Sequence, residues 1–143
     1  MLVIHLKDSI AMNYAKRERE RALTAASEKA FTSTSYEYVK KKIKKLGLED
    51  MVIPVKGFFQ DTLPHLRSKL CFALVDCDLK ESTIFCAETI WQNLVTKGRI
   101  VFDDYTCREF QGARLGIEFF VNKHKTQFAG HGLMNRLYYV VKK

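Results

Sequence analysis

Short apolar runs recur along the chain and are separated by longer amphipathic stretches. Four runs have the length and composition of β-strands: residues 2–7 ("LVIHLK"), 51–57 ("MVIPVKG"), 69–76 ("KLCFALVD") and 99–104 ("RIVFDD"). The last two are apolar without alternation, which predicts strands that are covered on both faces. Pro54 within the second run favours an edge position there, because proline lacks the N–H that a neighbouring strand would use.

The stretches between these runs have helical periodicity. A helix is expected over about residues 14–29, and a second one has an apolar face made of Tyr36, Val39, Ile43 and Leu46. A capping box, Thr34-x-x-Glu37, predicts the start of this second helix, and Gly47 predicts its end. Two further helices are expected, one over about 81–95, ended by Lys97-Gly98, and one over about 108–123.

The chain ends in "TQFAGHGLMNRLYYVVKK" (126–143), which predicts two strands joined by a turn around Gly130 and Gly132. Strands that alternate with helices favour an α/β fold with a mainly parallel sheet, helices on both faces and antiparallel strands at the C-terminus. At 143 residues the chain has the length of one domain, so we expect a single domain over 1–143.

The chain is basic, with a formal net charge of +8, and five of its lysines lie within residues 40–45. No aromatic residue or arginine is interleaved with them, which favours a solvated helix face over a nucleic-acid surface. The four cysteines form no metal-binding or disulfide pattern, and no apolar run is long enough to cross a membrane. These features predict a cytoplasmic protein without a membrane or nucleic-acid partner.

Acidic residues follow three of the predicted strands: Asp8 after the first, Asp76 and Asp78 after the third, and Asp103 with Asp104 after the fourth. A right-handed crossover would bring the ends of the third and fourth strands together. Clustered carboxylates suit a hard cation such as Mg²⁺. The same residues are common as helix caps and in turns, with Asp78 or Ser82 before a helix and Asp104 in a turn. The pattern leaves both interpretations open.

Three boxes resemble, in order and spacing, the macrocin O-methyltransferase (TylF-type) family of S-adenosylmethionine-dependent methyltransferases. They are "VKGFFQDTLP" (55–64), "LVDCDLKEST" (74–83) and "IVFDDY" (100–105). The resemblance implies a Rossmann-like class I methyltransferase fold. It also implies methylation of a hydroxyl on a small molecule, of sugar or natural-product type, with S-adenosylmethionine and Mg²⁺ or a similar divalent cation as cofactors.

The resemblance also assigns roles to individual residues. Asp76, Asp103 and Asp104 would hold the metal, and Asp76 would in addition be the general base and lie beside the cofactor. Asp8 would bind the cofactor ribose, and Gly57 and Phe58 would lie beside its adenine. Asp78 would then cap or brace the helix that follows.

One family feature has no counterpart here, because the resemblance implies a first strand and a glycine-containing loop before residue 1. We therefore expect an N-terminally incomplete sheet and weakened cofactor binding. Two apolar strand edges would have to pair directly, stay exposed, or be completed by a second copy of the chain or a strand-complementing partner. The alternative function is a catalytically inactive methyltransferase-like module that works through protein association.

Overall fold

The structure, a computed structural model, describes residues 2–5, 35–107 and 111–143. The predicted helix over 14–29, the start of the one predicted over 108–123, and Asp8 lie outside these residues. The chain divides into two compact units, Met1–Thr62 and Leu63–Lys143. The expectation of a single domain stays a prediction. None of the described helices is long and apolar enough to cross a membrane.

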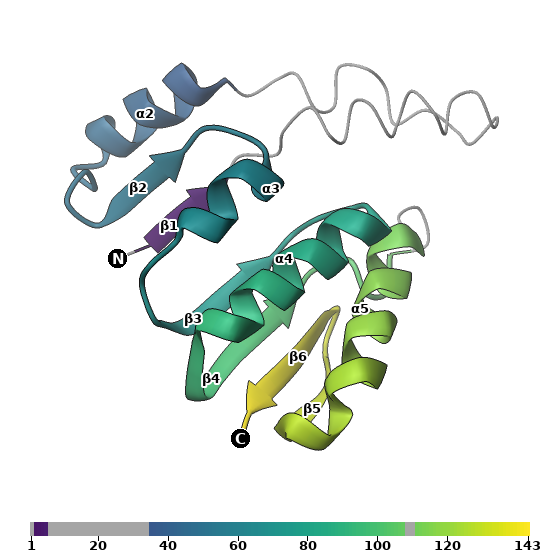
Figure 1. The fold of residues 1–143 in the computed structure, drawn as a ribbon. Helices are drawn as coiled ribbons and strands as arrows, with labels where there is room; N and C mark the ends of the chain where they lie inside the picture. Colours follow the sequence, from purple (N-terminus) through teal and green to yellow (C-terminus); the bar gives the residue numbers. More distant parts are fainter. Residues whose placement is uncertain (1, 6–34, 108–110) are drawn as a thin grey trace, which may run out of the picture. The chain divides into compact units, whose positions relative to one another are not determined.

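The first unit contains a small parallel sheet with a helix before and after its second strand (Figure 1). Its elements are β1 (Leu2–His5), α2 (Tyr36–Lys45), β2 (Val52–Val55) and α3 (Phe59–Thr62). Pro54 lies opposite Ile4 in the register. The predicted strands over 2–7 and 51–57 are therefore confirmed, the second somewhat shorter than expected, while residues 6 and 7 lie outside the described residues.

Helix α2 begins and ends at residues with specific capping chemistry. Ser35 is the N-cap, and its side chain accepts a hydrogen bond from the Tyr38 N–H at 3.1 Å. The predicted cap at Thr34 lies outside the described residues. Gly47 has a φ of 64° and follows the helix as predicted. Its N–H bonds the Lys44 carbonyl while the Leu48 N–H bonds the Ile43 carbonyl, a Schellman ending.

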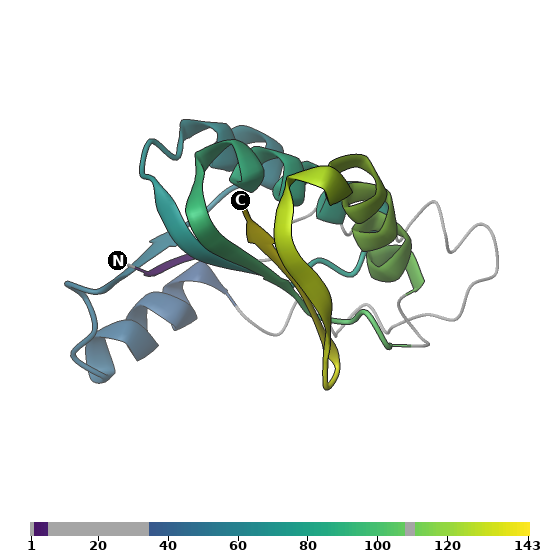
Figure 2. The same cartoon turned by 90° about the horizontal axis from the view of Figure 1, so that it is seen from below.

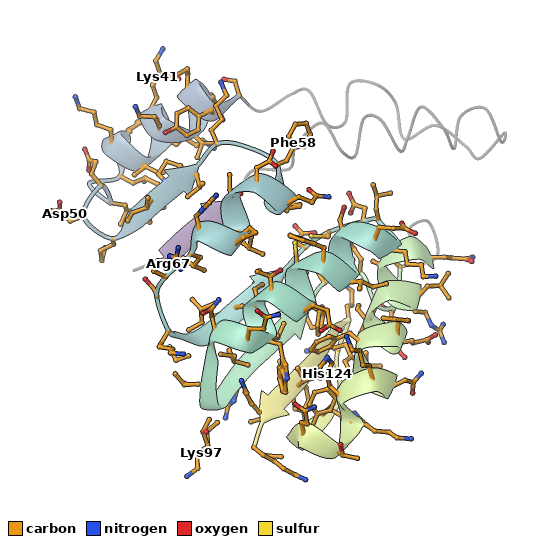
Figure 3. All side chains as sticks on the ribbon, in the orientation of Figure 1. Lys41, Asp50, Phe58, Arg67, Lys97 and His124 are labelled. Atoms are coloured by element: carbon orange, nitrogen blue, oxygen red, sulfur yellow. The ribbon has the colours of Figure 1, made fainter. Side chains whose placement is uncertain are left out.

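The lysines of α2 lie on its exposed side, and Figure 3 shows Lys41 pointing outward. Two of them lie over tyrosine rings of the same helix, Lys40 over Tyr36 at 5.6 Å and Lys42 over Tyr38 at 5.2 Å. These ring faces are therefore already in contact with ammonium groups. The expectation that this face is solvated, without a nucleic-acid partner, stays a prediction.

The second unit is a mixed four-stranded sheet in the order β3-β4-β6-β5. Strands β3 and β4 are parallel, whereas β6 is antiparallel to both of its neighbours. The C-terminal antiparallel strands were predicted and are confirmed. Its elements are β3 (Leu70–Val75), α4 (Lys80–Asn93), β4 (Leu94–Phe102), α5 (Gln111–His124), β5 (Phe128–Met134) and β6 (Leu137–Lys142), with 3₁₀ helices at Leu63–His65 and Lys125–Gln127.

Helices α4 and α5 pack on the same face of this sheet (Figure 2). Ile100, Phe102 and Val140 point toward them and are fully buried. The two helices approach closely at Gly116, where an added Cβ would lie 2.8 Å from the Lys80 carbonyl oxygen. This face is the core of the unit.

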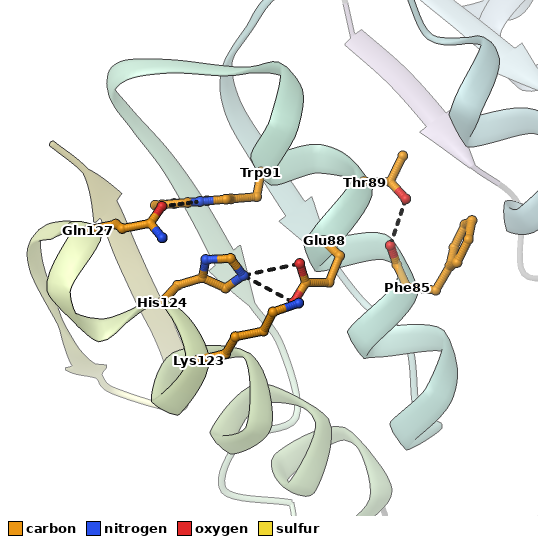
Figure 4. Close-up of polar contacts among 7 residues, drawn as sticks. All are labelled: Phe85, Glu88, Thr89, Trp91, Lys123, His124 and Gln127. Carbon is orange, nitrogen blue, oxygen red and sulfur yellow. Dashed lines mark hydrogen bonds and ion pairs between the residues drawn. The ribbon is translucent and has the colours of Figure 1, made fainter.

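Polar contacts reinforce the packing of α4 against α5 (Figure 4). Nε2 of His124 lies 3.1 Å from both carboxylate oxygens of Glu88, and Lys123 Nζ lies 2.9 Å from Oε1. The His124 ring is buried between Trp91 and Phe120, with ring centroids 5.6 and 4.8 Å away. Its Nδ1 is buried without a partner among the described residues. We therefore assign the proton to Nε2, which donates to Glu88.

The prediction that residues 69–76 form a strand covered on both faces is wrong. β3 is an edge strand that pairs only with β4 among the described strands. Phe72 and Leu74 point to the face opposite α4 and α5 and are 53% and 57% exposed. An apolar run of this length cannot by itself distinguish a central strand from an edge strand, because both can be apolar.

Two predicted turn positions also differ. Strand β4 begins at Leu94 directly after α4, so Lys97-Gly98 lies within the strand instead of ending the helix. Lys97 has a φ of 62°, and the register between β3 and β4 shifts in this region. The hairpin turn lies at Asn135, with a φ of 58°, whereas Gly130 and Gly132 belong to β5. Asparagine adopts the left-handed conformation more readily than other non-glycine residues do, so it can take the place of glycine in a tight turn.

Candidate active site

The carboxyl ends of β3 and β4 bring acidic side chains together. The Asp103 N–H donates to the Val75 carbonyl at 3.0 Å, which aligns the two strand ends. Asp76, Asp78 and Asp104 each place one carboxylate oxygen within 4.8 Å of the others. Asp76 and Asp104 of the predicted metal set are thus close together, and Asp78 joins them. We call these three residues the carboxylate group.

Asp103 has a different position. Its Oδ1 accepts a hydrogen bond at 2.8 Å from the N–H of Asp104, which has a φ of 59°. This contact fixes the backbone turn that aims Asp104 at the other acids. Asp103 is not a member of the carboxylate group, and its role as a metal ligand stays a prediction.

Asp78 is not the N-cap of the helix that follows. Helix α4 begins after Leu79, which occupies the N-cap position and provides no side-chain capping bond. Sequence analysis assigned Asp78 to a cap or brace because aspartate is common before helices. The backbone between β3 and α4 instead turns so that the carboxylates of Asp76 and Asp78 both lie close to the carboxylate of Asp104.

The residue between these two acids anchors the loop. Cys77 is buried, with its Sγ 3.7 Å from the Sγ of Cys86, and its carbonyl accepts a hydrogen bond from Thr83 Oγ1 at 2.8 Å. The contact with Cys86 and burial both raise the pKa of the Cys77 thiol, so it stays protonated and inert. The alternation of acid, buried cysteine and acid therefore presents both carboxylates from a fixed loop.

The carboxylate group is electrostatically crowded. Burial and the charge of Asp103 raise the pKa of Asp104 to about 6 from an ordinary 3.8, and a hydrogen bond with Asp78 and the charge of Asp76 add to this. Like charges at this separation favour an added proton or a bound cation. Three carboxylate oxygens are the donor type that hard divalent cations prefer. The residues present therefore fit Mg²⁺ or a similar ion.

The remaining predicted cofactor residues belong to the first unit. Gly57 has a φ of 140°, and a Cβ there would lie 2.6 Å from Cγ2 of Thr62. The turn into α3 is therefore enough to explain why this residue is a glycine. Phe58, which is labelled in Figure 3, precedes α3. Its carbonyl accepts hydrogen bonds from the N–H groups of Asp61 and Thr62. Their place beside the adenine of a cofactor stays a prediction, as does the role of Asp8 outside the described residues.

Sequence analysis did not find a pocket that begins at the residue after the carboxylate group. Its volume is about 310 Å³, and its lining combines tyrosine rings, aliphatic side chains and two polar residues: Tyr105, Ile117, Glu118, Val121, Asn122 and Tyr138. The Asp-Asp-Tyr box contained one signal, since Tyr105 directly follows Asp104. The other lining residues come from α5 and β6 and have no common pattern in the sequence.

Solved structures of O-methyltransferases share this fold. The O-methyltransferase NovP is 22% identical over 80% of this chain and 47% of its own, with a TM-score of 0.68. CalS11, a TDP-rhamnose 3′-O-methyltransferase of calicheamicin biosynthesis, is 18% identical over 73% of this chain and 50% of its own, with a TM-score of 0.58. The chain thus spans about half the length of either protein, and its fold is a methyltransferase fold.

The family follows from the sequence match. The model of the macrocin-O-methyltransferase (TylF) family matches residues 5–129, so the chain belongs to this family. The family resemblance drawn from the three boxes is therefore confirmed. No curated protein matches the chain by sequence.

Proposed function

We propose that the protein is an S-adenosylmethionine-dependent O-methyltransferase that methylates a hydroxyl of a small sugar-type or natural-product acceptor. Membership of the macrocin-O-methyltransferase family supports the reaction class. The observation that supports the site is the carboxylate group at the ends of two neighbouring parallel strands. Ligands of open α/β sheets lie beyond the carboxyl ends of the strands.

In this proposal Asp76, Asp78 and Asp104 hold a divalent cation, with Asp103 as the further ligand that the family resemblance implies. The cation would lower the pKa of the acceptor hydroxyl, and S-adenosylmethionine would supply the methyl group. Asp76 is the most exposed member of the carboxylate group. It is therefore the residue best placed to accept the hydroxyl proton as general base.

The test is isothermal titration of the chain with S-adenosylmethionine, with and without Mg²⁺, followed by a methyl-transfer assay. We expect measurable cofactor binding, and a loss of methyl transfer of about 100-fold or more in Asp76→Asn. Asp61→Asn, an exposed acid in α3, is the matched control. If the chain does not bind S-adenosylmethionine at millimolar concentration, the proposal that this chain is an active methyltransferase is wrong.

For the cofactor we propose contacts from Asp8, Gly57 and Phe58. Phe58 is only partly buried, so its ring is available for stacking on an adenine. Phe58→Leu should weaken cofactor binding by a factor of about 5 to 10 while leaving the cation response of the carboxylate group unchanged. Equal cofactor affinity in the variant would assign Phe58 to local packing alone.

A second candidate function is association of a catalytically inactive module through the open edge of β3. The exposed Phe72 and Leu74 favour it, because soluble proteins rarely leave apolar edge strands unprotected. We propose that the strand that pairs with this edge comes from a second copy of the chain. Basic residues precede the strand and acidic residues follow it, so antiparallel self-pairing would bring opposite charges together.

Sedimentation velocity over a range of concentrations tests this association. A concentration-dependent dimer should appear, and Leu74→Lys should abolish it, whereas Leu115→Lys, on the exposed face of α5, should not. A monomer at every concentration would contradict the association. Dimers that persist in Leu74→Lys would place the contact elsewhere.

We also propose a cytoplasmic location for the protein. All four cysteines are unpaired, and Cys71 is exposed. Unpaired thiols are typical of proteins in reducing compartments. Recovery of the native protein from a secreted fraction would contradict this assignment.

A further inference from the structure

The sheet of the second unit has one covered face and one open face. Helices α4 and α5 lie on the covered face, and no described helix of this unit lies on the other (Figure 2). Residues that pair across neighbouring strands point to the same side of a sheet. The register therefore defines the second face, which we call the open face: Phe72, Leu74, Arg99, Val101, Tyr139 and Val141. Sheets of α/β proteins bury both faces against helices, so the open face is the side of this unit that a further layer can cover.

The open face is mainly apolar. Phe72 and Leu74 on β3 are about half exposed, and Tyr139 on β6 is partly exposed. On β5 the face has no side chain at Gly130, where an added Cβ would meet no atom within 4 Å. Contiguous exposed apolar surface of this kind is typical of an interaction site.

Charge on the open face has one sign. The four strands of this sheet contain no Asp or Glu, and no acidic residue follows Glu118 in the chain. Arg99, on the inner strand β4, is exposed and has no hydrogen bond or ion pair among the described residues. Lys142, which points to the covered side, instead donates to the carbonyl oxygens of Trp91 and Leu94. The open face therefore presents a free guanidinium with apolar side chains around it.

The shape of the open face favours a helix as its partner. The main-chain N–H and C=O groups of the inner strands are already paired within the sheet, so only side chains are available on this face. Strand β6 has six residues and is about 20 Å long at about 3.3 Å per residue, the length of an α-helix of about 13 residues. An amphipathic helix has an apolar stripe with charged positions beside it. Carboxylates at those positions would complement Arg99.

We infer that the open face binds an amphipathic helix of a separate partner protein, with its apolar stripe against Phe72, Leu74 and Tyr139 and a carboxylate paired with Arg99. The inference goes beyond methyl transfer and does not depend on it, because no residue of the open face belongs to the carboxylate group. It also differs from edge pairing of β3. Edge pairing uses the main-chain groups of that strand and leaves Tyr139, two strands away, uncovered.

The test is fluorescence anisotropy of the full chain with a labelled helical peptide of about 14 residues that has a leucine stripe flanked by glutamates. A second peptide has lysine in place of every glutamate. The acidic peptide should bind about fivefold to tenfold more tightly than the basic one. Arg99→Glu should reverse this preference, and the reversal would itself show that the variant is folded.

The matched control for charge is Lys125→Glu, which makes the same change in the exposed 3₁₀ helix that follows α5. This variant should keep the preference of the wild type for the acidic peptide. Equal binding of the two peptides by the wild type would overturn the inference. An unchanged preference in Arg99→Glu would do so as well.

A second set of variants tests the apolar contact. Tyr139→Ala and Phe72→Ala should each weaken binding of the acidic peptide by about tenfold, because each removes an aromatic side chain from the contact. Leu115→Ala, at an exposed apolar residue of α5, is the matched control and should bind as the wild type does. Unchanged affinity in the first two variants, or an equal loss in all three, would contradict the proposed contact.

Other partners of the open face would give different results. A dimer that both Arg99→Glu and Tyr139→Ala abolish in sedimentation velocity would assign the face to a second copy of the chain and overturn the inference. Salt-dependent binding of a single-stranded oligonucleotide through Arg99, without binding of the acidic peptide, would also overturn it. Binding of the acidic peptide by a chain that binds no S-adenosylmethionine supports the helix site while removing the methyltransferase proposal.

Discussion

The two ends of the α4–α5 pair are built on opposite electrostatic principles. At the ends where the helices begin, three aspartates lie close together, and the pKa of Asp104 rises to about 6 because of burial and the charge of Asp103. Near the end of α5, the Glu88 carboxylate is hydrogen-bonded by Lys123 and His124 (Figure 4). One end brings several carboxylates close together, whereas at the other end a single carboxylate is paired with a lysine and a histidine.

The difference separates structural residues from candidate functional ones. Burial raises the pKa of Glu88, but its hydrogen bonds with Lys123 and His124 outweigh this and leave the pKa below its ordinary 4.5. A paired carboxylate stabilises the fold, whereas crowded carboxylates cost stability, which an added proton or a bound cation offsets. Perturbation of this unfavourable kind is typical of functional sites. Ligand binding should therefore be tested at the carboxylate group and not at the Glu88 pairing.

Removing His124 should have the largest effect on stability. His124→Ala deletes a buried ring between Trp91 and Phe120 and leaves Glu88 with one fewer donor. The free energy of unfolding should fall by about 2–4 kcal/mol, measured by urea denaturation. His65→Ala, at an exposed histidine, should change it little. A similar loss in both variants would show that the aromatic packing is not the cause.

Neutralising Asp104 should change the free energy of unfolding in the opposite direction, that is, increase it. Its pKa is raised in the folded state, so the charged carboxylate costs stability as the pH rises through about 6. Asp104→Asn should therefore raise the free energy of unfolding at neutral pH, by up to about 1 kcal/mol after solvent screening. The gain should shrink toward pH 3.8, the ordinary pKa of the carboxyl. Destabilisation of this variant in EDTA would contradict the crowding.

Asp104→Asn should be more stable than the wild type in the absence of a cation, and added Mg²⁺ should reverse this order. A cation that binds only the folded chain stabilises it, by about 1 kcal/mol at five times its dissociation constant, and the stabilisation then rises with the logarithm of the cation concentration. The wild type should gain thermal stability with Mg²⁺, and Asp104→Asn should gain much less. Asp61→Asn is the control for nonspecific ionic effects. The same response in all three proteins would exclude a cation site at the carboxylate group.

At the end where Glu88 is paired, the free energy of unfolding should change at a lower pH than it does through Asp104. The Glu88 pKa is depressed in the folded state, so its contribution is present above 4.5 and is lost as the pH falls through the lower folded value. Glu88→Gln should flatten this acid limb by about 0.5–1 kcal/mol. An unchanged limb in equilibrium unfolding would assign the acid sensitivity to other carboxylates.

The smallest effect is expected at Gln127, whose Oε1 accepts the Trp91 indole N–H at 3.1 Å (Figure 4). Gln127 is exposed, so water can replace its amide, and Gln127→Ala should cost about 0.5 kcal/mol. Gln92→Ala, at an exposed amide of α4, serves as the reference for this measurement. A loss as large as that of His124→Ala would mean that the indole bond, and not the buried ring, holds this end together.

Most elements of the described fold were predictable because they depend on local chemistry. The position of α2, its glycine ending and the antiparallel pair at the C-terminus follow from periodicity and turn residues, although Ile43 alone of the predicted apolar face is buried and Leu46 is exposed. The turn at Asn135 and the position of Lys97-Gly98 inside β4 were not predictable, because glycine and asparagine both adopt positive φ and the choice depends on strand register. Edge exposure at Phe72 is likewise a property of the sheet and not of the strand.

The sequence by itself determined the family, through three boxes in the family's order and spacing, and it determined that acids end two neighbouring strands. Only the tertiary structure decided which acids meet. Asp78 joins Asp76 and Asp104, while Asp103 bonds the backbone N–H of its neighbour. The reason is that side-chain direction at a strand end depends on the turn that follows, and that turn is fixed by the buried Cys77 and its contacts in α4.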